Sequence, residues 1–211
     1  MLILQCILAY NPTLWIPLIR LYSGYLAEAG EFATVIKILE KENSINMEQD
    51  PYVWLHLGIS YLNIRAPQKA IAAFEKAIII DDEYVDALQN LGAVHLSRWL
   101  TLKEQSDYDR AIDLFNRIIS IDPEYSGAFT SRGVAYLQWG KTEAAIQSWE
   151  QAIKIAPDAG KTYYYLGLAY LSKGDKPHAY MNLSKYKEKY SHVLSEKEQA
   201  ELDRLIALVR D

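Results

Sequence analysis

The side chains of this chain that could carry out chemistry are histidines, acids and one cysteine, and their spacing forms no reaction centre. The histidines lie far apart, without the H-x3-H spacing that places two metal ligands on one helix face. They are His56, His95, His178 and His192. Cys6 is the only cysteine in the sequence, which excludes a cysteine zinc site and an internal disulfide framework. We therefore expect each histidine to be a packing or surface residue.

The remaining polar residues do not favour catalysis either. The sequence has no glycine-rich phosphate loop, and nothing in it brings a serine, a histidine and an aspartate together. Paired acids such as Asp81 and Asp82 stand at an expected helix boundary, where capping explains them. We therefore expect a non-enzymatic chain with no catalytic residue, no metal site and no cofactor.

The charge balance narrows the class of partner. The 211 residues include 22 basic and 27 acidic ones, for a net charge of −5, and no basic run occurs. This argues against nucleic acid and against an anionic membrane surface as partners. Half of the residues are hydrophobic, which is typical of a packed chain. We expect another protein or peptide as the partner, and the cytoplasm as the compartment, although no signal names one.

An internal repeat supplies the elements that must position any functional side chain. The cleanest copy is residues 51–84. It carries Trp54, Leu57, Gly58 and Tyr61 in a first amphipathic segment and Ala70, Phe74 and Ala77 in a second. Much of this pattern returns in residues 126–159, with Gly133 and Trp149 at the matching places, and again 34 residues later, with Gly167 and Leu183. A repeat of this length predicts stacked supersecondary units.

These residues resemble the signature of the tetratricopeptide-repeat (TPR) family, W-x2-L-G-x2-Y, then A-x3-F, then P. The resemblance covers nearly the whole chain and implies an all-α fold. The implied architecture is a right-handed superhelical solenoid of antiparallel helix pairs, in which the first helices line a concave groove. It also implies a protein-binding scaffold or adaptor.

The repeat register divides the chain into units. The expected units are a half-repeat at 1–14 (second helix only), a degenerate repeat at 15–50, repeats at 51–84, 85–125, 126–159 and 160–193, and a capping helix at 194–211. In the degenerate repeat, Leu18, Leu21, Tyr22 and Tyr25 are expected to fill the first helix. Asp50 before Pro51 predicts a capped helix start. Ser195 and Glu198 predict a capping box.

The N-terminal stretch leaves alternatives open. Leu4, Ile7 and Pro12 have the mutual spacing of Trp149, Ala152 and Pro157, which favours a packed half-repeat. Exposed apolar residues at 2–10 would then favour self-association or continuation into further repeats. Residues 1–19 are also uncharged, so a membrane-tethered assembly factor is a second possibility, although two prolines interrupt the run.

The unit at 85–125 contains an insertion. Gly92 and Ala111 are 19 residues apart, whereas Gly58 and Ala70 are 12 apart. We expect the inserted residues to lengthen the first helix before Asp107 caps the second. The apolar side chains of this stretch, Trp99, Leu100 and Leu102, either fold back on the array or project toward a partner.

The candidate binding face lies beside the signature residues on each first helix. It comprises Leu55, Ile59, Leu62, Asn63, Gln89, Ala93, Leu96, Thr130, Val134, Leu137, Gln138, Tyr164, Leu168 and Leu171. By the resemblance this face lines the groove, and its apolar character suits an apolar or amphipathic helix. Packing of neighbouring first helices against each other is the competing interpretation.

One subset of the family binds acidic chaperone tails with a two-carboxylate clamp of Lys and Asn, then Asn, then Lys and Arg on three successive first helices. In this chain the clamp positions hold Leu55, Ile59, Asn90, Gly127 and Ser131. One unit further along they hold Gln89, Ala93, Ser131, Lys161 and Tyr165. One match in each set is what chance gives, so we do not expect acidic-tail binding.

Overall fold

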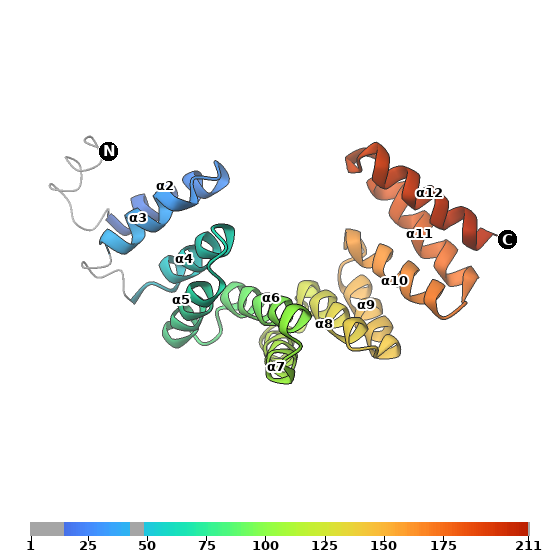
Figure 1. Ribbon diagram of the computed structural model, residues 1–211, viewed down its shortest axis with the longest axis horizontal. Coiled ribbons are helices and arrows are strands. Elements are labelled where there is room, and N and C mark those ends of the chain that lie inside the picture. The colour runs from blue at the N-terminus through green and yellow to red at the C-terminus, as the bar shows by residue number, and fades with distance from the viewer. Residues whose placement is uncertain (1–14, 43–48, 211) are drawn as a thin grey trace. The chain divides into compact units, whose positions relative to one another are not determined.

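The computed structural model describes residues 15–42 and 49–210, with side chains from residue 21 on except those of 22, 41 and 42. Every regular element in this part of the chain is a helix (Figure 1). The helices are α2 (Trp15–Glu28), α3 (Phe32–Glu42), α4 (Pro51–Asn63), α5 (Pro67–Ile80), α6 (Val85–Leu102), α7 (Gln105–Ile121), α8 (Ser126–Gln138), α9 (Thr142–Ile155), α10 (Gly160–Ser172), α11 (Lys176–Tyr190), the 3-10 helix η3 (Ser191–Val193) and α12 (Glu196–Arg210). The predicted all-α fold is confirmed, while the half-repeat at 1–14 lies outside the described residues.

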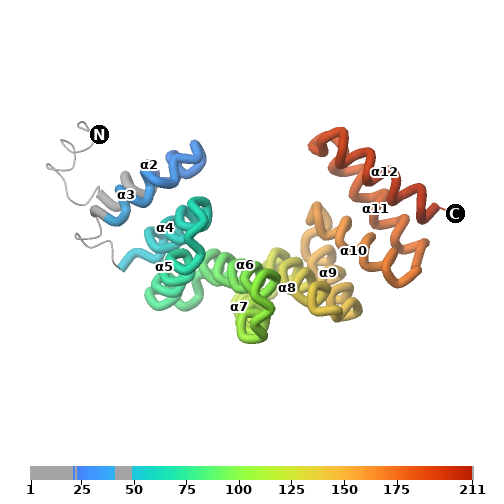
Figure 2. Tube along the Cα trace, in the orientation of Figure 1, coloured from blue at the N-terminus to red at the C-terminus, as the bar shows by residue number. Residues whose placement is uncertain are grey.

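The chain divides into two compact units, one ending at Val94 and one beginning at His95. Within each unit, successive helices fold back on each other as hairpins, which Figure 2 traces along the backbone. The hairpins are α2 with α3 and α4 with α5 in the first unit, and α8 with α9 and α10 with α11 in the second. Each hairpin also packs on a neighbouring one, because a single amphipathic pair cannot bury its own apolar face.

The core of the first unit lies between α3, α4 and α5. Its fully buried large side chains include Val35 of α3, Leu57 of α4 and Phe74 of α5. Helix α4 begins as the sequence predicted. The Asp50 carboxylate accepts the backbone N–H of Tyr52 at 3.1 Å, and proline occupies the first helical turn, where it leaves no N–H unpaired.

The prediction for the apolar face of α2 is wrong in part. Leu21 and Tyr25 are 73% and 66% exposed, whereas Ser23 and Leu26 are buried. Gly24 stands 34 residues before Gly58, so the repeat register places Ser23 and Gly24, and not the bulkier Leu21 and Tyr25, at the helix contact. Residue size in this degenerate repeat is therefore a poorer guide to burial than its register.

The second unit is built around large buried side chains that face small residues. Trp149 of α9 is fully buried against Gly133 of α8, and its indole N–H donates to the Thr130 carbonyl oxygen at 3.0 Å. Gly167 of α10 and Leu183 of α11 form the corresponding close contact in the next hairpin. The absent side chain at each glycine is what lets the two helices of a hairpin approach this closely.

The turns within three hairpins need a left-handed residue. Gly140, between α8 and α9, has a φ of +83°, and Gly30 and Gly174 have similar values in their own turns. Glycine adopts this conformation without a steric penalty, which explains these predicted hinges. The α4–α5 turn uses Arg65 instead, with a φ of 60°.

Helix α12 begins as the sequence predicted. Ser195 and Glu198 form a capping box, in which the Glu198 carboxylate accepts the Ser195 N–H at 2.8 Å and the Ser195 hydroxyl lies 3.4 Å from the Glu198 N–H. Helix α12 packs on α11 and buries Leu202 and Val209.

The insertion lengthens helix α6 to 18 residues, compared with 13 in α4, α8 and α10. Trp99 folds back and is buried beside the Tyr108 and Trp139 rings, while Leu100 and Leu102 stay exposed. The predicted cap at Asp107 is wrong. Helix α7 already begins at Gln105, and the Asp107 carboxylate is buried, where it pairs with side chains of α6 instead of with the helix end.

Candidate functional site

In the first unit, the predicted binding face is partly covered. Leu55 is buried, whereas Ile59 and Leu62 of α4 are half-buried. Asn63 is exposed, and its amide donates to the Ile59 carbonyl oxygen at 2.9 Å. In the first half of α6, Gln89 is half-buried and Ala93 is exposed. The accessible part of this face therefore consists of half-exposed aliphatic groups bordered by polar side chains.

In the second unit, the same face occurs on two neighbouring first helices. Thr130 of α8 and Thr162 of α10 place their hydroxyl oxygens 3.0 Å apart, so the two helices lie in contact. The predicted residues of these helices that are half-buried are Thr130, Val134, Leu137, Tyr164, Leu168 and Leu171, with Gln138 exposed. Leu96 of α6 is buried.

The inner edges of these side chains contribute to the core. Val134 and Leu137 pack against the cluster around Trp149, and Tyr164 and Leu171 pack against the cluster around Leu183. Each of them is only half-buried, so part of its side chain remains accessible. These residues thus combine support for the hairpins with an accessible apolar surface.

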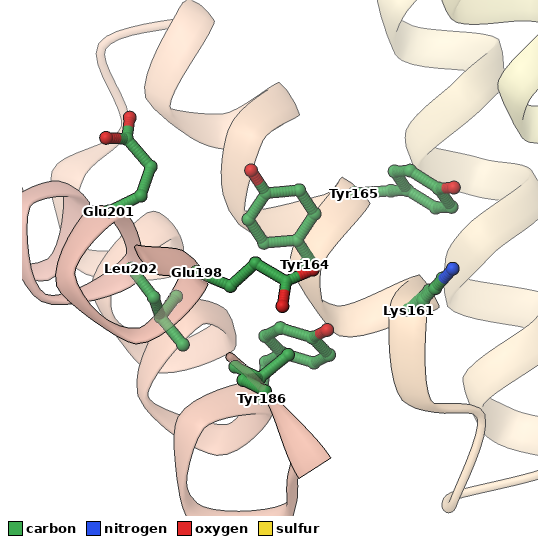
Figure 3. A pocket seen from close by; sticks show the side chains of 8 residues that line it. Lys161, Tyr164, Tyr165, Tyr186, Glu198, Glu201 and Leu202 are labelled. Atoms are coloured by element: carbon green, nitrogen blue, oxygen red, sulfur yellow. The ribbon is translucent and has the colours of Figure 1, made fainter. Parts of the chain in front are cut away.

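This face leads into a pocket of about 260 Å³ between α10, α11 and α12 (Figure 3). The residues that line it are Lys161, Tyr164, Tyr165, Tyr186, Leu194, Glu198, Glu201 and Leu202. The Tyr164 ring lies 5.4 Å from the Tyr186 ring and 6.3 Å from the Tyr165 ring, measured between centroids and tilted in both cases. The pocket therefore joins aromatic walls to charged groups.

The electrostatics of the pocket centre on Glu198. Hydrogen bonds from the Ser195 side chain and backbone lower the pKa of Glu198, and the positive charge of Lys161 lowers it further. Burial raises the pKa of Tyr186, and the Glu198 charge adds to that increase. At neutral pH the pocket thus contains an ionised carboxylate beside neutral phenol rings.

A second pocket, of about 400 Å³, lies among α9, α10 and α11. Its polar groups are largely paired. The Tyr170 hydroxyl donates to Glu150 at 2.7 Å, and Asn182 donates to a backbone carbonyl of its own helix. Burial and the bond to Glu150 raise the pKa of Tyr170 to about 12. This pocket offers fewer free polar groups than the first.

The structure also assembles a cluster that the sequence did not predict. His95 Nδ1 lies 2.6 Å from one Asp107 oxygen, and Arg98 Nε lies 3.2 Å from the other. The insertion changes the number of residues between matching positions of α6 and α7, compared with the other repeats. The residue spacing of the family could therefore not have indicated this contact. His95 Nε2 is buried without a hydrogen-bond partner among the described residues. The cluster joins α6 to α7.

Of the pocket residues, the sequence predicted only Tyr164 as part of a binding site. Nothing in the sequence indicated that Tyr186 and Glu201 line a pocket, because a tyrosine in a second helix and an acid on a polar helix face are both common in repeat proteins. Glu198 was recognised solely as a helix cap. Lys161 and Tyr165 were considered only as clamp positions. The pocket depends on how α12 packs beside α10 and α11, which no local pattern specifies.

In the described part of the chain, no helix combines the length and apolar character needed to cross a membrane. The same residues contain no group of three or more His, Cys, Asp or Glu side chains arranged to hold a metal ion.

Comparison with known proteins shows similarity to repeat proteins. A family model described as "Tetratricopeptide repeat" matches residues 57–126, and one described as "TPR repeat" matches residues 135–174. The general transcriptional corepressor trfA of Dictyostelium discoideum is 26% identical over 60% of this chain and 9% of its own length. The small glutamine-rich tetratricopeptide repeat-containing protein 2 of Mycosarcoma maydis is 38% identical over 32% of this chain and 19% of its own length.

Heat shock protein STI1 of Saccharomyces cerevisiae is 32% identical over 37% of this chain and 14% of its own length. The chain thus spans a fifth or less of each of these curated relatives. Among solved structures, MamA is 26% identical with a TM-score of 0.66, over 85% of this chain and 96% of that one. The thermophilic TPR protein TTC0263 of Thermus thermophilus is 18% identical with a TM-score of 0.68, over 89% and 95%, and this likeness concerns the fold alone. Together with the signature residues and the helix hairpins, these matches show that the chain belongs to the tetratricopeptide-repeat family, whose fold serves as a scaffold for protein–protein interactions.

Proposed function

We propose that this chain is a non-enzymatic adaptor that holds an apolar or amphipathic helix of another protein against the predicted face of α8 and α10, the first helices of its second unit. The observation that carries the proposal is the half-exposed apolar surface on α8 and α10, formed by Val134, Leu137, Leu168 and Leu171. An amphipathic helix presents apolar side chains at i, i+3, i+4 and i+7, which suits a surface of this kind. Exposed amides such as Gln138 border it and are available to the polar edge of such a helix.

A panel of amphipathic helical peptides, tested against the intact chain by fluorescence anisotropy, provides the test. The triple variant Val134→Ser, Leu168→Ser and Leu171→Ser, all within the second unit, should lose binding at least about tenfold, because each change removes apolar contact area. Ile79→Ser is the matched control, since Ile79 is 81% exposed on α5 and lies off this face. Its binding and melting temperature should equal those of the wild type.

The melting temperature of the triple variant decides between the two interpretations of this face. A folded variant that no longer binds supports the proposal. A variant that unfolds under the same conditions shows that these side chains are essential core residues, and the proposal then fails. Binding that persists in a folded variant also refutes it.

Acidic chaperone tails are not the proposed partner. In one register the clamp positions on the successive first helices provide no cation, and one unit further along they provide a single one, Lys161. A synthetic peptide ending in acidic residues should therefore bind no more tightly than its amide-substituted counterpart. A clear preference for the acidic peptide would contradict this part of the proposal.

A further inference from the structure

The pocket beside α12 has walls suited to a cation. Tyr164 of α10 and Tyr186 of α11 form its aromatic walls, and their rings meet at a tilted angle of 45°. Tyr165 also lines the pocket, but its ring stacks on Trp149. The face of an aromatic ring carries partial negative charge, so rings around one cavity attract a cation, and a guanidinium group stacks on them readily. The rings alone thus favour a positively charged ligand over an anionic one.

A carboxylate is available to pair with that cation. In the view of Figure 3 the Glu198 carboxylate lies between Tyr164 and Tyr186. Its Oε2 accepts both the Ser195 N–H and the Ser195 hydroxyl, and no described residue donates to its Oε1. One carboxylate oxygen is therefore fixed by the helix cap, and the other is left for a ligand. Because the cap holds the side chain in place, little further ordering is needed when a ligand binds.

Two other charges line the pocket, and they act in opposite directions. Glu201 adds a second carboxylate, paired only at 3.9 Å with Arg204 on the outer side of α12. Lys161 supplies a positive charge, but its side chain is exposed and points away from Glu198 in Figure 3. No salt bridge joins Lys161 to Glu198 in the described part of the chain, although the lysine charge still lowers the pKa of Glu198. The excess charge of the lining is negative.

The size of the cavity matches a single side chain. At about 260 Å³ it lies just below the range of about 300–1,000 Å³ that is usual for small-molecule sites. Leu194 and Leu202 provide apolar surface on which the methylene stem of a long side chain could pack. Tyr164 also belongs to the face proposed for the partner helix, so the pocket lies at the end of that face on α10.

We infer that this pocket takes the guanidinium of an arginine side chain from the bound protein segment, stacked on the tyrosine rings and paired with Glu198. The inference rests on the proposed function, since the arginine belongs to the segment held on the first helices. A guanidinium is preferred to an ammonium because it is planar, less strongly hydrated and able to offer two parallel N–H groups to a carboxylate.

The probe is N-acetyl-arginine N-methylamide, titrated into the intact chain while the tyrosine ring resonances are followed by NMR. The citrulline analogue keeps the shape of the side chain and removes its charge. The arginine probe should bind about tenfold more tightly than the citrulline probe, as expected when a charge-assisted pair and ring stacking are lost together. Equal binding of the two probes, or tighter binding of the lysine analogue, would overturn the inference.

Three variants make the test specific, because they should weaken, strengthen and leave unchanged the binding of the arginine probe. Because Glu198 is exposed, Glu198→Gln should weaken arginine binding by about two- to fivefold. The variant keeps the helix cap, because glutamine also serves in a capping box. Lys161→Gln should strengthen binding about two- to threefold, because it removes a competing positive charge. Glu188→Gln removes one exposed negative charge of α11 away from the pocket lining and should leave binding unchanged. A weakening in Glu188→Gln equal to that in Glu198→Gln would reduce the effect to net charge and refute the site.

The failure of this inference is distinguishable from failure of the proposed function. If amphipathic peptides bind the wild type but their arginine and citrulline versions bind alike, the adaptor function stands and the arginine pocket falls. If the arginine probe shows the expected dependence on Glu198 but no amphipathic peptide depends on Val134 and Leu168, the pocket stands and the helix-binding face falls.

Discussion

The contact between Gly133 and Trp149 allows a sharp test of how the helices of a hairpin pack. A methyl group added at Gly133 would lie 2.4 Å from Trp149 Nε1 and 2.6 Å from Cδ1. Trp149 is fully buried, so its ring has little room to move away. The perturbation is therefore Gly133→Ala, which adds one carbon atom to the chain. Gly133→Leu adds the same clash and more.

The expected loss of stability follows from three contributions. Overpacking a filled core costs about 1–3 kcal/mol. If the ring shifts, the indole N–H loses its 3.0 Å bond to Thr130 inside the core, and an unpaired buried donor costs a further amount of about 1–3 kcal/mol. Alanine has the higher helix propensity, which offsets about 1 kcal/mol. The free energy of unfolding should thus fall by about 1–5 kcal/mol.

Urea unfolding followed by far-UV circular dichroism and by tryptophan fluorescence measures this loss. Gly24→Ala is the control, because Gly24 occupies the equivalent repeat position and the nearest described atom, Tyr52 Oη, would lie at an ordinary 3.5 Å. That variant should be neutral or more stable by up to about 1 kcal/mol. In a Trp149→Leu background, the cost of Gly133→Ala should shrink by at least about 0.5 kcal/mol, since the two residues are in contact. A Gly133→Ala protein as stable as the wild type, or an equal cost in both backgrounds, would refute this packing argument.

Other predictions concern single contacts. Gly140→Ala should destabilise the protein by about 1 kcal/mol in thermal melts, because it removes glycine from a left-handed turn. Arg65→Gly should stabilise it by about 0.5–1 kcal/mol, because it places glycine in such a turn. Equal effects of the two variants would contradict this prediction. Burial, followed by the bond to Glu40, raises the pKa of Tyr61 from 10.0 to about 12. The stability that the neutral Tyr61 phenol contributes is therefore complete below pH 10 and is lost as pH rises from 10 to 12. In Tyr61→Phe the melting temperature should fall less steeply between about pH 9 and 12 than in the wild type. The same fall in both proteins would argue against this prediction. Ser195→Ala should cost about 0.5–2 kcal/mol in urea unfolding through the lost cap, and no change would show that α12 does not depend on it.

The repeat pattern predicted the fold well because each of its positions has a local physical reason. Gly133 is small where helices meet, Gly140 turns the chain, and Asp50 caps a helix, so each is recognisable from its neighbours alone. The pattern failed where a position was degenerate. Leu21 and Tyr25 look like core residues by type, and only the repeat register indicates that Ser23 and Gly24 face the neighbouring helices.

The candidate site was less predictable, because it depends on contacts between elements. Helical periodicity placed Val134, Leu168 and Tyr164 on one face, but it did not show that Leu55 and Leu96 on the same face are buried. How deeply a side chain is covered depends on the distance to the next helix, and sequence spacing carries no information on that distance. The interaction of Asp107 with α6 was missed for the same reason. From the sequence alone, Asp107 was expected to cap the second helix of its unit, because aspartate is common at helix starts.

Glu198 illustrates why one residue can satisfy a sequence rule and still have an unrecognised role. The capping box requires only an acceptor at this position, which glutamine would supply as well as glutamate. A cation pocket requires the charge itself, because a neutral amide cannot pair with a guanidinium in the same way. The cap fixes the carboxylate through Oε2 and leaves Oε1 without a donor among the described residues, so the start of α12 also completes the wall of the pocket. The two roles separate under Glu198→Gln, which preserves the acceptor and removes the charge. Stability and ligand binding can therefore be measured independently at this one position.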